Sequence, residues 1–160
     1  MAHLPRVPDL NAQRAAMGKL AFLAGKWNGE ARLLCGRDEW IDLHQSEEAQ
    51  YKLDGLILVI EGIGRTKSDG HSVLQALGVI SFDDETATYR IRAFNDGRFL
   101  ESELLLGQEQ AISWGFNLGQ VTTKSVLRIN ESGEWTELAE IKIGSEPPKT
   151  LLELTVRRAG

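Results

Sequence analysis

The feature that most constrains this chain is a series of turn signals that recurs along residues 25–160. Short runs rich in Val, Ile, Leu, Thr and aromatic residues alternate with clusters of Gly, Asp, Asn, Ser and Pro, spaced roughly 10–15 residues apart. The clusters are Gly36-Arg37-Asp38, Asp54-Gly55, Ser68-Asp69-Gly70, Asp83-Asp84-Glu85, Asn95-Asp96-Gly97, Gly107-Gln108, Gly119-Gln120, Ser132-Gly133 and Glu146-Pro147-Pro148. These nine separators predict ten short strands.

No second helical pattern interrupts the series, so consecutive strands are expected to pair as hairpins. Closing such a long meander removes its two exposed edges. In front of it, Asp9 is the predicted N-cap of a helix whose apolar residues run from Leu10 to Leu23, and Gly25 ends it. We therefore expect an all-β fold, an up-and-down antiparallel β-barrel of about ten strands with the N-terminal helix plugging one end. A two-sheet sandwich is the alternative.

Length and composition narrow the class of protein. The 160 residues fit a single domain, with the tail and helix in residues 1–24 and the barrel in residues 25–160. A formal charge of -5 with dispersed Lys and Arg argues against nucleic acid as a partner. No apolar run approaches the ~18 residues of a spanning helix, and Cys35, the single cysteine, fits a reducing compartment. We expect a cytoplasmic protein that binds no nucleic acid and no membrane, and a homodimer is left open.

Alternation along each strand predicts which side chains face the barrel interior. Trp27 lies on the apolar face of the first strand, and Tyr89 lies on the apolar face of the fifth. Trp114 and Phe116 share the apolar face of the seventh strand. Large aromatic side chains are therefore expected to line the interior.

Five polar side chains share the parity of these apolar faces. They are Gln45 and Glu47 on the second strand, Thr123 and Ser125 on the eighth, and Glu137 on the ninth. Either a bulge or an early strand end turns each of them outward, or they point into the barrel. An interior carboxylate without a partner costs several kcal/mol, so it would have to be paired, protonated or hydrated. Several such residues on separate strands favour a cavity with a few convergent polar groups, as in small-molecule sites.

Three short motifs occur in order along the chain. They are Leu23-Ala24-Gly25-Lys26-Trp27-Asn28-Gly29, Gly78-Val79-Ile80-Ser81-Phe82-Asp83 and Glu153-Leu154-Thr155-Val156-Arg157-Arg158. In this order and spacing they resemble the bacterial lipocalin-like (calycin-type) domain family of unknown function, distant relatives of nitrobindin-type haem-binding barrels. The resemblance implies that Trp27 plugs the closed end of the barrel and that the Arg158 guanidinium stacks on it. The parity of Arg158, which matches that of Leu154 and Val156, agrees with this role.

A haem-binding relative would supply a histidine from a late strand, and here the histidines are His3, His44 and His71. His3 lies in the tail, His44 has the outward parity of its strand, and His71 opens a strand beside a turn. We therefore expect neither haem nor another cofactor. The spacing of these histidines and Cys35 also matches no zinc site, so no metal is expected.

The sequence thus favours intracellular binding of a small, largely apolar ligand, fatty-acid-like or aromatic, in the barrel interior. Tyr89, Trp114 and Phe116 would supply apolar contact, and the five inward polar side chains would orient the ligand. The alternative is an enzyme of isomerase or cyclase type, in which Glu137 has its pKa raised by burial and by Glu47 and serves as the general acid or base. A third possibility is a barrel filled by its own side chains. We favour binding over catalysis and assign no catalytic residue beyond the candidate Glu137.

Overall fold

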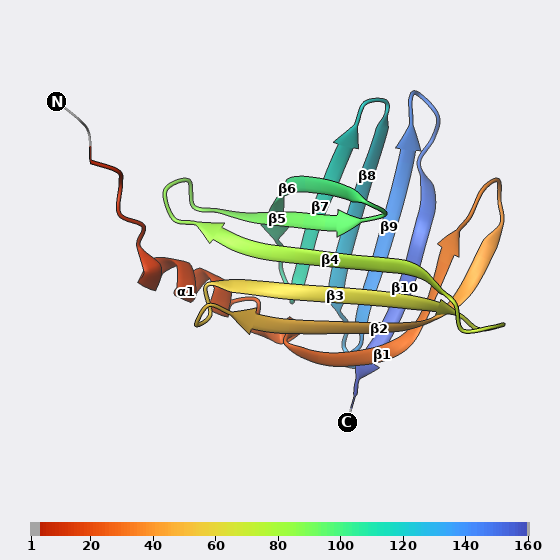
Figure 1. The fold of residues 1–160 in the computed structure, drawn as a ribbon, viewed down its shortest axis with the longest axis horizontal. Helices are drawn as coiled ribbons and strands as arrows, with labels where there is room; N and C mark the ends of the chain where they lie inside the picture. Colours follow the sequence, from red (N-terminus) through yellow and green to blue (C-terminus); the bar gives the residue numbers. More distant parts are fainter. Residues whose placement is uncertain (1–3, 160) are drawn as a thin grey trace.

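Ten antiparallel strands form one closed barrel behind a short N-terminal helix (Figure 1). The computed structural model describes residues 4–159. The helical elements are α1 (Leu10–Gly18) and a 3-10 turn, η1 (Ala21–Leu23). The strands are β1 (Gly25–Leu34), β2 (Trp40–Lys52), β3 (Ile57–Thr66), β4 (Ser72–Asp83), β5 (Thr88–Asn95), β6 (Arg98–Leu106), β7 (Ala111–Leu118), β8 (Val121–Ile129), β9 (Trp135–Ile143) and β10 (Lys149–Arg158).

The strand order confirms the predicted up-and-down barrel. Each strand pairs with the next along the chain, and β1 also pairs with β10, which closes the sheet on itself. In Figure 1, strands β2 to β5 run nearly across the direction of β7 to β10, and β1 bends from one set to the other. Neither helical element in residues 4–159 combines the length and the apolar character needed to cross a membrane.

The N-terminal helix begins where the sequence predicts and ends earlier. Asp9 is its N-cap, since Asp9 Oδ1 accepts a hydrogen bond from the backbone N–H of Ala12 at 3.0 Å. The helix stops at Gly18, a residue of low helix propensity, and the predicted last turn forms the separate η1. Beyond the break, Leu20 and Leu23 are fully buried in the core.

Two tyrosine hydroxyls hold α1 against the barrel. The hydroxyl of Tyr51 donates to the carbonyl of Met17 at 2.6 Å, and the hydroxyl of Tyr89 donates to the carbonyl of Ala16 at 2.7 Å. Both carbonyls lie in the last turn of α1, where helical carbonyls are available to outside donors. Tyr89 is therefore part of the contact between helix and barrel.

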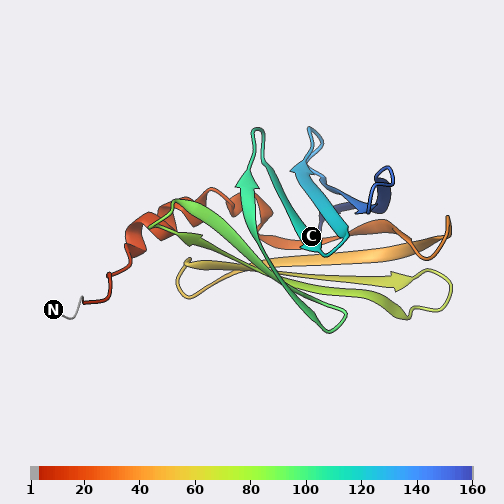
Figure 2. The ribbon, with the colours of Figure 1, turned by 90° about the horizontal axis from the view of Figure 1, so that it is seen from above.

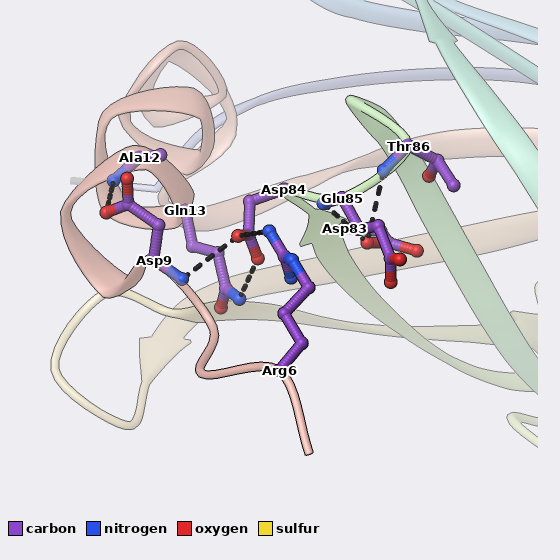
Figure 3. Close-up of polar contacts among 8 residues, drawn as sticks. All are labelled: Arg6, Asp9, Ala12, Gln13, Asp83, Asp84, Glu85 and Thr86. Atoms are coloured by element: carbon purple, nitrogen blue, oxygen red, sulfur yellow. Dashed lines mark hydrogen bonds and ion pairs between the residues drawn. The ribbon is translucent and has the colours of Figure 1, made fainter. Parts of the chain in front are cut away.

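A buried carboxylate in the β4–β5 turn fixes the segment that leads into α1 (Figure 3). Asp84 receives hydrogen bonds from Gln13 Nε2 at 2.8 Å and from the backbone N–H of Asp9 at 2.9 Å, and its carboxylate also pairs with Arg6. These contacts, with the bond from Gln13 contributing most, hold the pKa of Asp84 far below its usual value. The charge of Asp84 is thus fully satisfied by the protein.

The strand register settles which way the polar residues of β2 point. β2 pairs with β1 and with β3 without a register shift over the whole of Trp40–Lys52. Gln45 and Glu47 therefore face the interior together with Leu43 and Ala49, and all four side chains are buried. The choice that the sequence left open, between a bulge and an inward polar pair, is decided in favour of the pair.

One end of the barrel is closed by stacked side chains, as the family resemblance implied. The Arg158 guanidinium lies 4.3 Å from the centre of the Trp27 ring and donates to the carbonyls of Ala24 and Phe22 at 2.7 and 3.0 Å. The indole N–H of Trp27 donates to the carbonyl of Leu23 at 2.9 Å. Trp135 packs edge-on against Trp27 with ring centres 5.5 Å apart, and both indoles are 1% exposed. We call this region the closed end.

The opposite end is less tightly filled. Inward-facing side chains there remain partly exposed; they are Leu33, Ile41, Leu74, Phe116 and Thr123. The pairing of the sheet is also short on one side of the barrel. β6 and β7 pair at three positions, Leu104 to Leu106 with Trp114 to Ile112. Every other neighbouring pair of strands is joined at seven or more positions. Figure 2 shows the β5–β6 and β7–β8 hairpins diverging beyond this contact. We call this region the open end.

Candidate functional site

The interior polar cluster begins on β2, in the middle of the barrel. Gln45 and Glu47 are 3% and 8% exposed and are joined by a hydrogen bond from Gln45 Nε2 to Glu47 Oε1 at 2.9 Å. Alternation of β2 places the two side chains on the same face, since they are two residues apart. A strand that otherwise buries apolar residues thus carries an amide and a carboxyl group into the core.

The neighbouring strand β3 makes room for this pair by having no side chains there. Gly62 lies beside Glu47 and Gly64 beside Gln45 in the register. A Cβ added to Gly62 would lie 2.7 Å from both carboxylate oxygens of Glu47, and a Cβ added to Gly64 would lie 2.6 Å from Gln45 Oε1. Both distances are shorter than a normal contact. The carboxyl and amide groups therefore lie directly over the two glycines.

A second carboxyl group reaches the interior from β9. Glu137 pairs with Leu127 of β8 and Leu154 of β10, whose side chains face the core and are 1% and 3% exposed. Glu137 itself keeps partial exposure between these two buried neighbours. Glu137 is therefore less completely enclosed as a residue than Glu47.

Burial raises the pKa of both interior carboxyl groups. Loss of hydration raises the pKa of Glu47 well above its usual value, and the nearby charge of Glu137 raises it further, against a smaller opposing effect of the Gln45 hydrogen bond. Loss of hydration also raises the pKa of Glu137 to about 7, and the indole of Trp135 opposes this rise. Because the two groups influence each other, they titrate as a pair and hold a proton near neutral pH.

Two polar atoms beside these carboxyl groups have no partner. Among residues 4–159, Gln45 Oε1 and Trp135 Nε1 are buried and make no hydrogen bond of normal geometry. Leaving such an atom unsatisfied costs about 1–3 kcal/mol. Native proteins leave few buried polar groups in this state without a reason such as a binding role or an ordered water. The cluster of Gln45, Glu47, Trp135 and Glu137 is our candidate site, and we call it the interior acid cluster.

The remaining predicted contact residues lie on adjoining parts of the wall. Trp114 pairs with Ser125, and Phe116 pairs with Thr123, so these four side chains form one inward patch on β7 and β8. All four are partly exposed, and Thr123 Oγ1 accepts a hydrogen bond from the backbone N–H of Phe116 at 3.2 Å. Tyr89 lies elsewhere, at the contact with α1. A ligand-contact role for these residues stays a prediction.

Two hollows on the surface of the protein are separate from this cluster. One, of about 590 Å³, lies at the β5–β6 hairpin between Phe94, Phe99 and the start of β4. Another, of about 530 Å³, lies between the β8–β9 turn and the end of β10. Neither is lined by Trp114 or Glu137.

The described histidines lie at the surface, away from the interior acid cluster. His44 is exposed on the outer face of β2, and His71 lies 3.6 Å from Asp69 at the surface. His3 lies outside the described residues. Within residues 4–159, no three His, Cys, Asp or Glu side chains gather closely enough to hold a metal ion.

Comparison with known proteins extends the description of the fold. No family model and no curated protein matches the chain. The barrel is similar to that of Rv2717c from M. tuberculosis. Its crystal structure matches with a TM-score of 0.69 and 12% sequence identity, over 91% of this chain and 98% of the Rv2717c chain. At this identity the likeness to Rv2717c concerns the barrel fold alone.

Sequence reasoning missed one member of the site, Trp135, and the two glycines that lie beside this site, Gly62 and Gly64. Trp135 has the right parity, but nothing in the sequence shows that its N–H lacks a partner. Gly62 and Gly64 have no side chain to give a parity signal, although their pairing with Glu47 and Gln45 could have been predicted. A hairpin pairs residues that are equally far from its turn. Counted from the predicted Asp54-Gly55 turn, this rule pairs Gly62 with Glu47 and Gly64 with Gln45.

Proposed function

We propose that this barrel binds a small, largely apolar molecule that has one polar end, as a member of the lipocalin-like family that its motifs resemble. The apolar part of the ligand would lie against Trp114 and Phe116 toward the open end. The polar end would reach the interior acid cluster. Thr123 and Ser125 would supply further hydrogen bonds along the way.

The observation that carries this proposal is the pair of unpartnered atoms, Gln45 Oε1 and Trp135 Nε1, beside the buried carboxyl group of Glu47 and the partly exposed Glu137. A barrel that needed nothing but a dry core would be more stable with apolar residues at these positions. Instead, glycines at 62 and 64 make space for the polar side chains. A polar group of a ligand would supply the missing hydrogen bonds.

The exposed surface of the protein also supports a partly hollow barrel. The total accessible area is 9996 Å², whereas a compact monomer of 17.7 kDa exposes about 7,900 Å². Part of the excess belongs to the extended segment before α1, where Leu4 and Val7 are 90% and 85% exposed. The rest agrees with the incomplete burial of inward-facing side chains at the open end.

A filling substitution tests whether the interior is hollow and used. Ser125 faces inward, and Lys124, next to it on β8, faces outward and is exposed. In a hollow barrel, Ser125→Trp would leave the stability nearly unchanged and would abolish binding of an uncharged fluorescent dye such as Nile red. In a solid core the same change would cost about 1–3 kcal/mol of unfolding free energy. Lys124→Trp is the matched control and should change neither quantity.

Wild-type protein, stripped of bound lipid, should bind the dye saturably at one site with roughly micromolar affinity. Native mass spectrometry of freshly purified protein should show a co-purifying small molecule. Absence of both dye binding and a bound molecule, together with strong destabilisation by Ser125→Trp, would refute the proposal. The barrel would then be filled by its own side chains.

One observation favours catalysis as a second candidate function. The pKa of Glu137, raised by burial to about 7, is suited to a general acid or base at neutral pH. Such a group could transfer a proton to or from an apolar substrate in an isomerase or cyclase reaction. Loss of turnover in Glu137→Gln, with ligand binding retained, would distinguish this function from binding alone.

A further inference from the structure

The interior acid cluster offers far more hydrogen-bond acceptors than donors. Glu47 and Glu137 contribute carboxyl oxygens, and Gln45 contributes an unpartnered amide oxygen. The donors are Gln45 Nε2, which already bonds Glu47, the indole N–H of Trp135, and the one proton that the carboxyl pair holds until it ionises. With Glu47 ionised, the observed amide orientation is the one that satisfies the carboxylate, and it leaves Gln45 Oε1 free to accept. The cluster is therefore complementary to a group rich in donors.

The surrounding wall supplies no positive charge to this cluster. Beside Glu47 in the register lie Trp27 of β1 and Gly62 of β3, and beside Glu137 lie Leu127 of β8 and Leu154 of β10. Facing the cluster from these strands within residues 4–159 there is thus no basic or further titratable side chain. Arg158, a basic residue on the inner face of β10, stacks on Trp27 and donates to the carbonyls of Ala24 and Phe22. In the described part of the chain, no basic side chain contributes to the pKa shift of Glu47 or of Glu137.

We propose that the ligand of this barrel is an apolar amine, whose ammonium group binds beside Glu47 and Glu137 and donates to Gln45 Oε1. This inference rests on the proposed function and names the chemical class of the ligand. An ammonium group has three donors and one positive charge, which match two carboxylates and one amide oxygen. A fatty acid, the other apolar class considered, would bring a third carboxyl group to a cluster that already lacks donors.

Binding of the ammonium group is linked to release of a proton. In the free protein the carboxyl pair holds a proton near neutral pH, because burial and mutual repulsion oppose its full ionisation. A bound cation favours the ionised form of both groups, so the proton passes to solvent when the ligand binds. Alkylamines stay protonated up to about pH 10, like the lysine side chain. The affinity for an amine should therefore rise between pH 6 and pH 8.

Three ligands with the same alkyl chain separate head-group chemistry from apolar contact. Decylamine, decanol and decanoate are each titrated against Nile red bound to the whole protein, at pH 6 and at pH 8. At pH 8 decylamine should displace the dye at least about tenfold more tightly than decanol, and decanoate more weakly than either. The advantage of decylamine over decanol should shrink at pH 6, while the affinity for decanol stays constant.

A pair of double variants shows whether the interior carboxyl groups cause the preference. Glu47→Gln with Glu137→Gln should abolish the advantage of decylamine and retain binding of decanol. The control, Glu48→Gln with Glu140→Gln, makes the same charge change on the outer faces of β2 and β9, and it should behave like wild type. This control excludes attraction of the amine to the net negative surface.

The outcomes separate the two proposals. If decanol or decanoate binds as tightly as decylamine at pH 8, the amine inference is wrong and the binding function stands. If the outer double variant loses the preference as well, the amine inference is also wrong. If none of the three compounds and no dye enters the barrel, the proposed function fails together with the inference.

Discussion

The closed end and the interior acid cluster are made from neighbouring residues of the same strands, yet they differ in whether their polar atoms have hydrogen-bond partners. At the closed end, the indole N–H of Trp27 and the guanidinium of Arg158 both donate to backbone carbonyls. In the interior acid cluster, the pKa of Glu137 is raised by burial more than the indole of Trp135 lowers it, and within the described chain Gln45 Oε1 receives no hydrogen bond. Trp27 and Arg158 thus have partners within the protein, whereas the interior acid cluster leaves buried polar atoms without one.

Asp84 sharpens the same contrast among carboxylates. Its side chain is 5% exposed, yet three donors satisfy it and its pKa is lowered. Glu47 is buried to a similar degree and has its pKa raised. Burial alone therefore does not mark a functional carboxylate. What distinguishes the interior acid cluster is burial without enough donors.

The largest expected effect compares two tryptophans at the two ends of the barrel. Trp27→Ala should lower the unfolding free energy by about 3–5 kcal/mol, because the indole is fully packed between Trp135 and Arg158. Trp114→Ala, at a partly exposed indole, should cost about 1–2 kcal/mol. Urea denaturation measures both. Equal losses would show that the two ends are packed alike.

The next effect concerns the pH dependence of stability. Because the pKa of Glu137 rises from 4.5 to about 7 on folding, its protonated form favours the folded state, and this contribution is lost as pH rises from about 4.5 through 7. Glu137→Gln should therefore be more stable than wild type by about 3 kcal/mol at pH 8 and equally stable near pH 4.5. Denaturation at several pH values measures the difference. Glu140→Gln, on the outer face of β9, should follow the wild-type profile.

A smaller effect tests how much the contacts of Arg158 stabilise the closed end. Arg158→Lys keeps the charge and loses the planar group that stacks on Trp27 and reaches two carbonyls. We expect a loss of about 1 kcal/mol in unfolding free energy. Arg157→Lys, where an exposed guanidinium pairs with the partly buried Glu134 and the charge is kept, should change it by a few tenths at most. The prediction fails if the two substitutions have the same effect.

The smallest effect on the whole barrel is expected at Asp84. Asp84→Asn removes the charge that pairs with Arg6 and receives bonds from Gln13 and Asp9. The backbone amides of α1 should then exchange hydrogen faster, while the urea midpoint of the barrel stays nearly constant. A midpoint shift as large as that of Arg158→Lys would show that α1 and the barrel unfold as one unit.

Much of the fold follows from local sequence signals. Turn residues mark the ends of the strands, and parity assigns Trp27, Trp114 and Glu137 to the inner face, as the register shows. Parity gives the face of a residue but not its depth along the barrel. The hydroxyl of Tyr89 donates to α1, a contact that parity could not predict, and its role as a ligand contact stays a prediction.

The interior acid cluster was partly visible in the sequence. Gln45, Glu47 and Glu137 could be selected because polar residues interrupt apolar faces. The space above Gly62 and Gly64 was missed, because an absent side chain gives no periodic signal and becomes informative only through its partner across the hairpin. The short pairing of β6 with β7 was not predicted either, because turn signals give the ends of strands and not how far two neighbours stay paired.

The short pairing of β6 with β7 determines where the barrel can open locally. Three residue pairs are a small fraction of the ladder that encircles the molecule, so thermal fluctuation can part β6 from β7 while the other strands keep their bonds. If the barrel binds a ligand as proposed, the ligand would enter and leave at the rate at which β6 and β7 separate, which is far faster than global unfolding. A disulfide between cysteines substituted for Leu105 and Ser113 would then lengthen the residence time of the ligand without changing the inward-facing side chains.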